Sequence, residues 1–268
     1  MSSESGWRTF LGPIALLVFS YFIYFVRYPL WQTFTFVEPL FIMLFLSYFA
    51  VLVLSLFLLK KEFKKSFSEV FKIRGFPMIV MGVIFALLFQ ALWLLFSLGF
   101  GSRLEFTSFT SLRGYEEYAV YSLFVGFVLY LAFAIFGTFA EEVAYRSYVQ
   151  PRIQAKYGYI VGIFCASLFF SLQHIHFFQL NWIERFFQTQ FVYVFLFGIF
   201  AGYLFFKSKG DIWSVFTFHA TMNICNISLP LQVTPIFSYV NQLATILSFL
   251  LLFLLLRFGL KGRSIKET

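Results

Sequence analysis

The sequence predicts an all-α fold, a polytopic transmembrane bundle of about eight helices. Of its 268 residues, 60% are hydrophobic and only 12% are charged, whereas soluble domains carry about a quarter charged residues. So few charges cannot cover a water-facing surface, and the mean hydropathy of +0.84 leads to the same conclusion. A transmembrane helix requires about 20 mostly apolar residues, and stretches of this kind recur from one end of the chain to the other.

Eight apolar runs supply the expected helices. The fifth, sixth and seventh are short or interrupted by polar residues, so the number of spans is open by one. The polar connector Lys60–Arg74 and the short loop Gly101–Glu117 leave no room for a separate soluble domain. We therefore expect one integral membrane domain over residues 1–268. In chain order the runs are Thr9–Val26, Val37–Leu59, Pro77–Leu98, Tyr118–Ala140, Gly158–His174, Phe191–Phe206, Ile212–Leu229 and Ile236–Leu256.

The basic residues indicate how the chain is oriented in the membrane. The net charge is +8, and the Lys and Arg residues gather at the ends of the apolar runs. If eight spans start from a cytoplasmic N-terminus, the outer side holds only Arg27, Arg103, Arg113 and Arg185, and the inner side holds the other sixteen of the 20. This asymmetry follows the positive-inside rule. We expect both termini in the cytoplasm and a location in the cell membrane, with the basic residues contacting the lipid bilayer and no nucleic-acid partner.

Three groups of polar residues interrupt the apolar runs. Charged groups within membrane spans are costly, so each such group suggests a functional site. One group follows the fourth run, one ends the fifth run, and one lies inside the seventh. The groups are Glu141, Glu142 and Arg146; Phe170 and His174; and His219 and Asn223.

Helical spacing suggests how the first group is used. Residues three or four apart share a helix face, so Glu142 and Arg146 are neighbours and we expect an ion pair between them. Adjacent residues point about 100° apart, so Glu141 faces elsewhere and is available for another task. The spacing of four also places His174 on the face of Phe170, and Asn223 on that of His219.

A second geometric argument brings the first two groups together. Gly158 predicts a turn after the helix-unfriendly Pro151. Glu141 lies 16 residues before Tyr157, and His174 lies 16 residues after Gly158, so both stand about 24 Å from the turn in an antiparallel hairpin. A carboxylate and an imidazole at one depth could activate water. This arrangement requires the fourth helix to continue past Ala140.

Each group alone has a simpler explanation. A pair of glutamates at a helix end is usually interfacial and solvated, and a single intramembrane histidine more often packs than catalyses. His219 and Asn223 could link helices by hydrogen bonds, and Gly198-x-x-x-Gly202 indicates close helix packing. His176, beside a polar loop, is interpreted as structural or interfacial. Taken together, the three groups favour a polar catalytic or transport site.

The three groups also match a known pattern. In chain order, Glu141-Glu142-x-x-x-Arg146, Phe170-x-x-x-His174 and His219-x-x-x-Asn223 resemble the three signature motifs of the CPBP family of intramembrane proteases. This family includes the type II CAAX prenyl endopeptidases and bacterial proteins once grouped with abortive infection. The resemblance spans residues 141–223, inside an expected catalytic region of about 118–229, and the N-terminal runs share only their hydrophobicity with it.

The resemblance implies a role for each residue. Glu141 would be the general base, and His174 would help to bind and polarise the attacking water. His219 and Asn223 would stabilise the oxyanion of the tetrahedral intermediate, and the site would be supported by Glu142, Arg146 and Phe170. Glu141, His174 and His219 could also form a three-ligand zinc site. The chain has no His-Glu-x-x-His motif, and we favour a mechanism without a tightly bound metal or other cofactor.

We therefore expect an intramembrane endopeptidase whose substrate is a membrane-associated or prenylated peptide or protein. Removal of the last three residues of prenylated CAAX proteins is one candidate reaction. A secondary transporter and a non-catalytic membrane scaffold or immunity-type protein stay open as alternatives. The depth of the site presents a difficulty, because the turn about 24 Å from Glu141 falls on the cytoplasmic side. Either the turn projects beyond the bilayer, the helices are tilted, or the orientation is inverted.

Overall fold

The computed structural model confirms the all-α fold class. It describes residues 6–33, 37–73, 76–106, 123–175, 183, 186–228, 231–234 and 238–259. Within these residues eight long helices lie close to the eight apolar runs of the sequence. They are α1 (Arg8–Thr33), α2 (Val37–Phe63), α4 (Phe76–Gly99), α5 (Leu123–Glu142), α6 (Gln150–Gln173), α8 (Phe191–Lys207), α9 (Ile212–Ser228) and α10 (Ser238–Gly259). A short helix α3 (Phe67–Val70) lies between α2 and α4.

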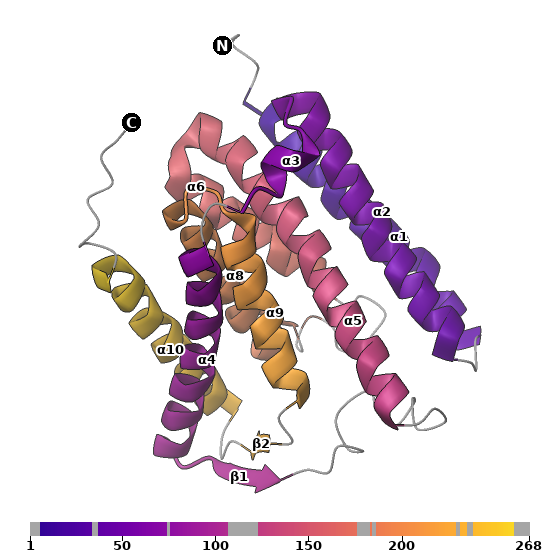
Figure 1. The fold of residues 1–268 in the computed structure, drawn as a ribbon. Helices are drawn as coiled ribbons and strands as arrows, with labels where there is room; N and C mark the ends of the chain where they lie inside the picture. Colours follow the sequence, from indigo (N-terminus) through magenta and orange to yellow (C-terminus); the bar gives the residue numbers. More distant parts are fainter. Residues whose placement is uncertain are drawn as a thin grey trace.

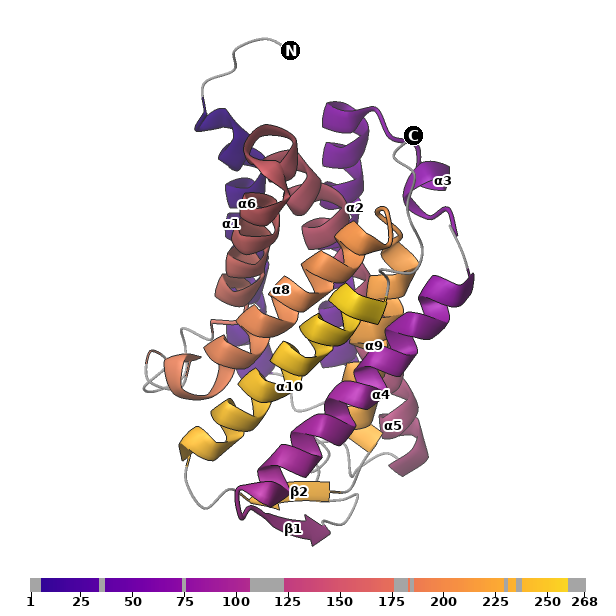
Figure 2. The same cartoon turned by 90° about the vertical axis from the view of Figure 1, so that its left-hand side faces the viewer.

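The long helices form one bundle with α9 near its middle (Figure 1). Helix α9 contacts α4, α5 and α8, and α4 also packs along α10 (Figure 2). Helices α1 and α2 lie side by side and cover α5 and α6. The central position of α9 gives its polar residues access to several neighbouring helices.

Helices α5 and α6 are joined without a loop. The helix continues past Ala140 as expected, because α5 runs directly into a π-helical segment, Val143–Val149, and then into α6. Pro151 stands in the first turn of α6, directly after the π-helical segment, and it has no backbone N–H to continue the hydrogen-bond pattern there. In the π-helical segment each N–H bonds one residue further back than in an α-helix, as the Gln150 N–H does to Tyr145 O.

The chain reverses at Gly158, as the sequence predicts. This glycine has φ 83° and ψ 166° inside α6, a backbone conformation that is essentially confined to glycine. Beyond it the second part of α6 returns along the first, and a Cβ at Gly162 would stand 2.8 Å from Gln154 Cβ. The rings of Tyr145 and Phe170 consequently meet across the hairpin with centroids 5.4 Å apart.

Two glycines let α8 approach α6 closely. A Cβ at Gly198 would stand 2.9 Å from Ser167 Cβ, and one at Gly202 would stand 2.9 Å from Gln150 Oε1. Gln150 also donates from Nε2 to Gly202 O at 3.0 Å. The packing expected from the Gly-x-x-x-Gly spacing is therefore present, because only glycine allows backbones to approach this closely.

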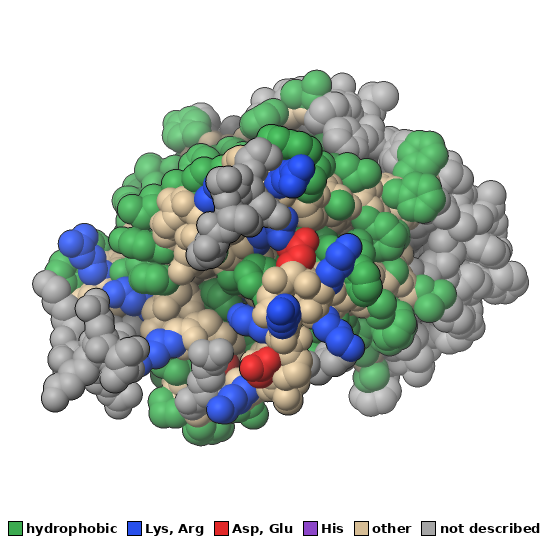
Figure 3. Space-filling model, turned by 90° about the horizontal axis from the view of Figure 1, so that it is seen from above, with side chains coloured by type: hydrophobic (Ala, Val, Ile, Leu, Met, Phe, Trp, Pro, Cys, Tyr) green, Lys and Arg blue, Asp and Glu red, His purple; other side chains and the backbone are tan. Residues whose placement is uncertain are grey.

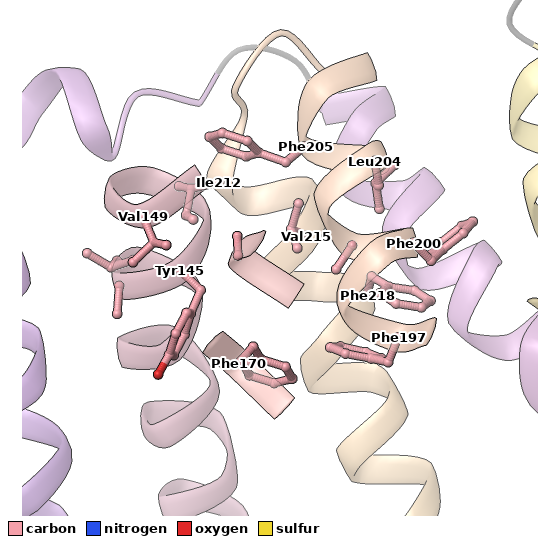
Figure 4. Close-up of a cluster of buried hydrophobic side chains, with 14 of the residues drawn as sticks. Tyr145, Val149, Phe170, Phe197, Phe200, Leu204, Phe205, Ile212, Val215 and Phe218 are labelled. Atoms are coloured by element: carbon pink, nitrogen blue, oxygen red, sulfur yellow. The ribbon is translucent and has the colours of Figure 1, made fainter. Parts of the chain in front are cut away.

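Aromatic side chains fill the centre of the bundle. Figure 4 shows rings and aliphatic groups of α6, α8 and α9 meeting the π-helical segment. Phe197 and Phe218 stack with centroids 5.3 Å apart, and Phe170 lies 5.8 Å from Phe197. Many other large apolar side chains are exposed on the outside of the bundle, the surface that a membrane protein presents to lipid.

The sequence did not predict a two-stranded ladder. Strand β1 (Arg103–Phe106) pairs antiparallel with β2 (Leu231–Thr234), with Arg103 opposite Thr234. The prediction of a loop over Gly101–Glu117 is therefore wrong for residues 103–106, and residues 107–122 lie outside the described part. Four residues are too few for alternation to distinguish a strand from a loop.

The two ends of the bundle differ in charge. Figure 3 views the end where α1 starts and α2 and α8 finish, and shows Lys and Arg side chains spread over it with few acidic ones between them. Arg8, Lys60, Lys61, Lys156 and Lys207 belong to elements that meet there. The ladder at the opposite end carries Arg103. We call the first end the basic end.

Three of the described helical stretches are long and apolar enough to cross a membrane, by length and composition. They are Phe76–Gly99, Ala134–Gln173 and Tyr239–Phe258, and Arg8–Ile23 and Phe191–Lys207 are shorter apolar helices. Together with the apolar exterior, these stretches identify a membrane protein.

Candidate active site

The three polar groups of the sequence come together between α5, α6 and α9. Glu141 and Glu142 end α5, His174 follows the last residue of α6, and His219 lies in the middle of α9. Glu141 is 6% exposed, and Glu142 is fully buried. The glutamates are thus an internal feature of the bundle, and the interfacial, solvated alternative does not describe them.

Glu142 stands at the centre of a buried charge network. Its Oε2 lies 3.4 Å from Nε of Arg146, the pairing expected from the spacing of four. Its Oε1 lies 2.7 Å from Nδ1 of His219, so α5 is tied to α9. The Arg146 guanidinium is fully buried and lies over the Phe170 ring, 5.1 Å from its centroid. Both charges of the pair are therefore compensated inside the protein.

The contact with Glu142 determines what His219 can do. The Nδ1–H donates to the carboxylate, so Nε2 is the ring atom that faces the rest of the site. It lies 4.0 Å from Oε2 of Glu141. A donor at Nε2 therefore requires the doubly protonated ring. The ring is also enclosed by the aromatic rings of Phe197, at 4.5 Å, and Phe170, at 5.9 Å.

Glu141 faces away from the Arg146 pair, as its position predicts. One carboxylate oxygen, Oε1, accepts hydrogen bonds from the Tyr48 hydroxyl at 3.4 Å and from Nε2 of Gln173 at 3.3 Å. The other oxygen, Oε2, is the one opposite His219. The hairpin argument is thereby supported, because Gln173, next to His174, reaches the depth of Glu141.

His174 is held in place by its own helix. Its Nδ1 lies 2.8 Å from Phe170 O, and its ring lies against the Phe170 ring with centroids 4.7 Å apart. With the proton on Nδ1, the Nε2 of a neutral ring is an acceptor. Phe170 therefore contacts both histidines and Arg146, and it connects the three groups by packing. His176 lies outside the described residues.

Asn223 lies one turn beyond His219 on α9. Its side-chain nitrogen donates to the hydroxyl of Thr138 on α5 at 2.8 Å. Because an amide group has two N–H donors, this bond orients Asn223 and leaves a second donor for a ligand. Further along the same face of α9, Asn226 accepts a hydrogen bond from Gln90 of α4 at 3.0 Å, which is the helix-linking role of polar residues in membranes.

The residues proposed for zinc are not arranged as a metal site. Among the described residues, no group of three or more His, Cys, Asp and Glu side chains is placed to hold a metal ion. The trio of Glu141, His174 and His219 therefore does not fit a preformed zinc site.

Sequence reasoning missed Tyr48, Gln173 and Thr138, which contact the polar groups directly. Tyr48 lies more than 90 residues before Glu141 and belongs to an apolar run without other distinguishing features. Gln173 precedes His174, and its polar side chain at the end of an apolar run was a usable signal. Thr138 lies one turn before Glu142 on α5.

The depth of the site can be measured along α9. His219 lies seven residues after Ile212, where α9 begins at the basic end, and so about 10 Å along the helix. The distance of about 24 Å is instead the distance from Glu141 to the tip of the α6 hairpin. This tip lies beside the start of α1, because the Tyr157 hydroxyl donates to Gly6 O at 3.0 Å. The site is thus nearer the basic end than the hairpin arithmetic suggested.

The fold and the site define an integral membrane helix bundle with an internal glutamate–histidine centre. Residues 122–225 match the family described as type II CAAX prenyl endopeptidase Rce1-like. This match confirms, over the matched segment, the resemblance of the motifs to the CPBP family of CAAX-type intramembrane proteases. The matched segment includes the three motifs and excludes Tyr48. No curated protein matches the chain.

Proposed function

We propose that the protein is an intramembrane endopeptidase in which Glu141 activates water to hydrolyse a peptide bond. The proposal is carried by one observation. A buried carboxylate oxygen, Oε2 of Glu141, faces the Nε2 of His219 across 4.0 Å, while its other oxygen is occupied by neutral donors. A group in this position can take a proton from a water molecule bound beside it.

The reaction follows from the donors and acceptors around that position. Glu141 removes a proton from water, assisted by His174 as an acceptor, and the resulting hydroxide oxygen bonds to the carbonyl carbon. The carbonyl oxygen becomes an oxyanion, which accepts hydrogen bonds from the Asn223 amide and from Nε2 of the doubly protonated His219. Collapse of the intermediate breaks the C–N bond, and the proton held by Glu141 passes to the leaving amine.

The substrate class is proposed from the family and from the setting of the site. A centre about 10 Å from the basic end is within reach of a short peptide anchored at that surface of the membrane. A prenylated Cys followed by three residues satisfies this requirement, and other membrane peptides would also do so. We further propose eight membrane passes, with the basic end and both termini in the cytoplasm, on the distribution of Lys and Arg.

The proposal predicts activity without a bound metal. The experiment compares purified wild type with Glu141→Ala and Glu142→Ala in detergent on a quenched farnesylated CAAX peptide, with and without a zinc chelator. The same samples are analysed for metal content, and the products are identified by mass spectrometry. We expect cleavage by wild type in the presence of chelator, no cleavage by Glu141→Ala, and reduced activity or stability for Glu142→Ala.

Other outcomes would redirect the proposal. Loss of wild-type cleavage on chelation, restored by zinc, would overturn the metal-independent mechanism. A folded wild type that cleaves neither this peptide nor other membrane peptides would favour the scaffold hypothesis. Flux of a solute through proteoliposomes, abolished by Glu141→Ala, would favour transport.

A further inference from the structure

We infer that Tyr48 and Gln173 are positioning residues for Glu141 and assign its Oε2 as the atom that takes the proton from water. The inference rests on the proposed peptidase function and extends it to α2, outside the segment that matches the family. Tyr48 and Gln173 come from α2 and α6, on different sides of Glu141 in the sequence.

The two donors meet on one oxygen. The Tyr48 hydroxyl and the Gln173 amide nitrogen lie 3.4 Å and 3.3 Å from Oε1 of Glu141. Two donors on Oε1 restrain the rotation of the carboxylate about its last side-chain bond. The remaining oxygen, Oε2, is then directed toward His219. The two oxygens consequently have different functions, one as an anchor and one as an acceptor.

The position of Tyr48 is fixed by the shape of α5. A Cβ at Gly137 would lie 3.2 Å from Cζ of the Tyr48 ring, so the ring packs against the backbone one turn before Glu141. Phe45, one turn earlier on α2, stacks on Phe136 with centroids 4.4 Å apart. These contacts place the hydroxyl beside Glu141 and limit the freedom of the Tyr48 side chain.

Neutral donors suit a general base better than a cation does. Arg146 forms its ion pair with Glu142, so the strongest cation of the site is directed to the neighbouring carboxylate. Hydrogen bonds from a phenol and an amide orient Glu141 through Oε1, and its second oxygen, opposite His219, can still accept a proton. Productive catalysis depends on such orientation, and misplacement by about 1 Å can cost about a hundredfold in rate.

The experiment uses Tyr48→Phe, which keeps the ring that packs on Gly137 and removes the hydroxyl, together with Gln173→Leu. The matched control is Tyr148→Phe. This variant also removes one hydrogen bond that a tyrosine hydroxyl makes, from Tyr148 to Glu62 of α2 at 2.9 Å. Tyr148 lies seven residues after Glu141 in the sequence. We expect each test variant to lower kcat roughly 10- to 100-fold with KM within about twofold, and the control to change neither.

A double-mutant cycle separates positioning from general damage. In a Glu141→Gln background, Tyr48→Phe should not lower the residual rate further, because the oriented carboxylate is already absent. An unchanged kcat for both test variants would overturn the inference, as would an equal loss of rate in the Glu141→Gln background.

An infrared measurement tests the contact without turnover. At acid pH the C=O stretch of protonated Glu141 is assigned by its absence in Glu141→Gln, and loss of a donor in Tyr48→Phe should shift it to higher frequency. A band that shifts in Tyr48→Phe, together with a wild type that cleaves no peptide, would support the contact and reject the peptidase proposal. An unshifted band would reject the contact whatever the activity.

Discussion

Replacing Glu142 by Gln would leave the buried guanidinium of Arg146 without a counter-charge. The two groups lie 3.4 Å apart with no solvent exposure, which corresponds to about 5 kcal/mol of attraction at an effective dielectric constant of about 20. Removal of one partner from a buried pair typically costs about 3–5 kcal/mol, since the other charge is left uncompensated. Glu142 also accepts the hydrogen bond from His219. We therefore expect Glu142→Gln to lower the free energy of unfolding by about 3–5 kcal/mol.

Glu141→Gln is the matched control, because it makes the same chemical change one residue away. Glu141 has no Arg within 4 Å among the described ion pairs, and the amide oxygen of Gln can accept the bonds from Tyr48 and Gln173. We expect this variant to keep only a low residual rate of turnover and to change the free energy of unfolding by less than about 1 kcal/mol.

Both variants can be compared by steric trapping in bicelles, which measures unfolding of a membrane protein without extraction, and by the midpoint of thermal unfolding in detergent. A difference of 3–5 kcal/mol corresponds to a shift of about 10 °C for a chain of this size. Equal stability of the two variants would refute the assignment of separate structural and catalytic roles to the adjacent glutamates.

Three further predictions follow from the backbone and the surface. Gly198→Ala should lower stability by about 1–3 kcal/mol in the same assays, because the new methyl group meets Ser167 at 2.9 Å. Gly99→Ala should leave stability unchanged, because a Cβ there would meet nothing within 4 Å. Equal losses in the two variants would contradict the close packing of Gly198 on Ser167. Gly158→Ala should cost about 1–3 kcal/mol despite open space, because φ is 83°; an unchanged midpoint would reject a fixed turn. The pKa of Glu69, outside the membrane, is lowered by hydrogen bonds from the backbone and hydroxyl of Ser66. These bonds should therefore stabilise helix α3 fully above the ordinary Glu pKa, and this stabilisation should be lost as the pH falls through the lowered pKa of Glu69. Amide exchange of Glu69, corrected for its intrinsic pH dependence, checks the sign, and stronger protection in acid would contradict it.

The long helices of this fold could be predicted because each apolar run is long enough to be recognised as a transmembrane helix. The pairing of Glu142 with Arg146 and the reversal at Gly158 were also accessible, since both depend on spacing within one helix or on the conformational freedom of one residue. The β1–β2 ladder was not, because its strands are four residues long and more than 120 residues apart.

The contacts between helices were harder to predict than the helices. The bond from His219 to Glu142 joins residues 77 apart, and the bond from Tyr48 to Glu141 joins residues 93 apart. Spacing along one helix carries no information about which neighbour a side chain meets. Tyr48 in particular is one of 15 tyrosines in the chain, and only the packing of α2 on α5 distinguishes it.

The π-helical segment Val143–Val149 is equivalent to an insertion in an otherwise continuous α-helix. The segment determines how the α6 hairpin, which ends at His174, is rotated about the helix axis relative to Glu141. Deletion of one residue there could restore α-helical bonding, but would turn everything after it by about 100° relative to α5. The Phe170 ring would then leave its place beside Arg146 and His219. The spacing between the first two motifs is therefore constrained in length as well as in composition, and this part of the chain should tolerate substitutions far better than changes in residue number.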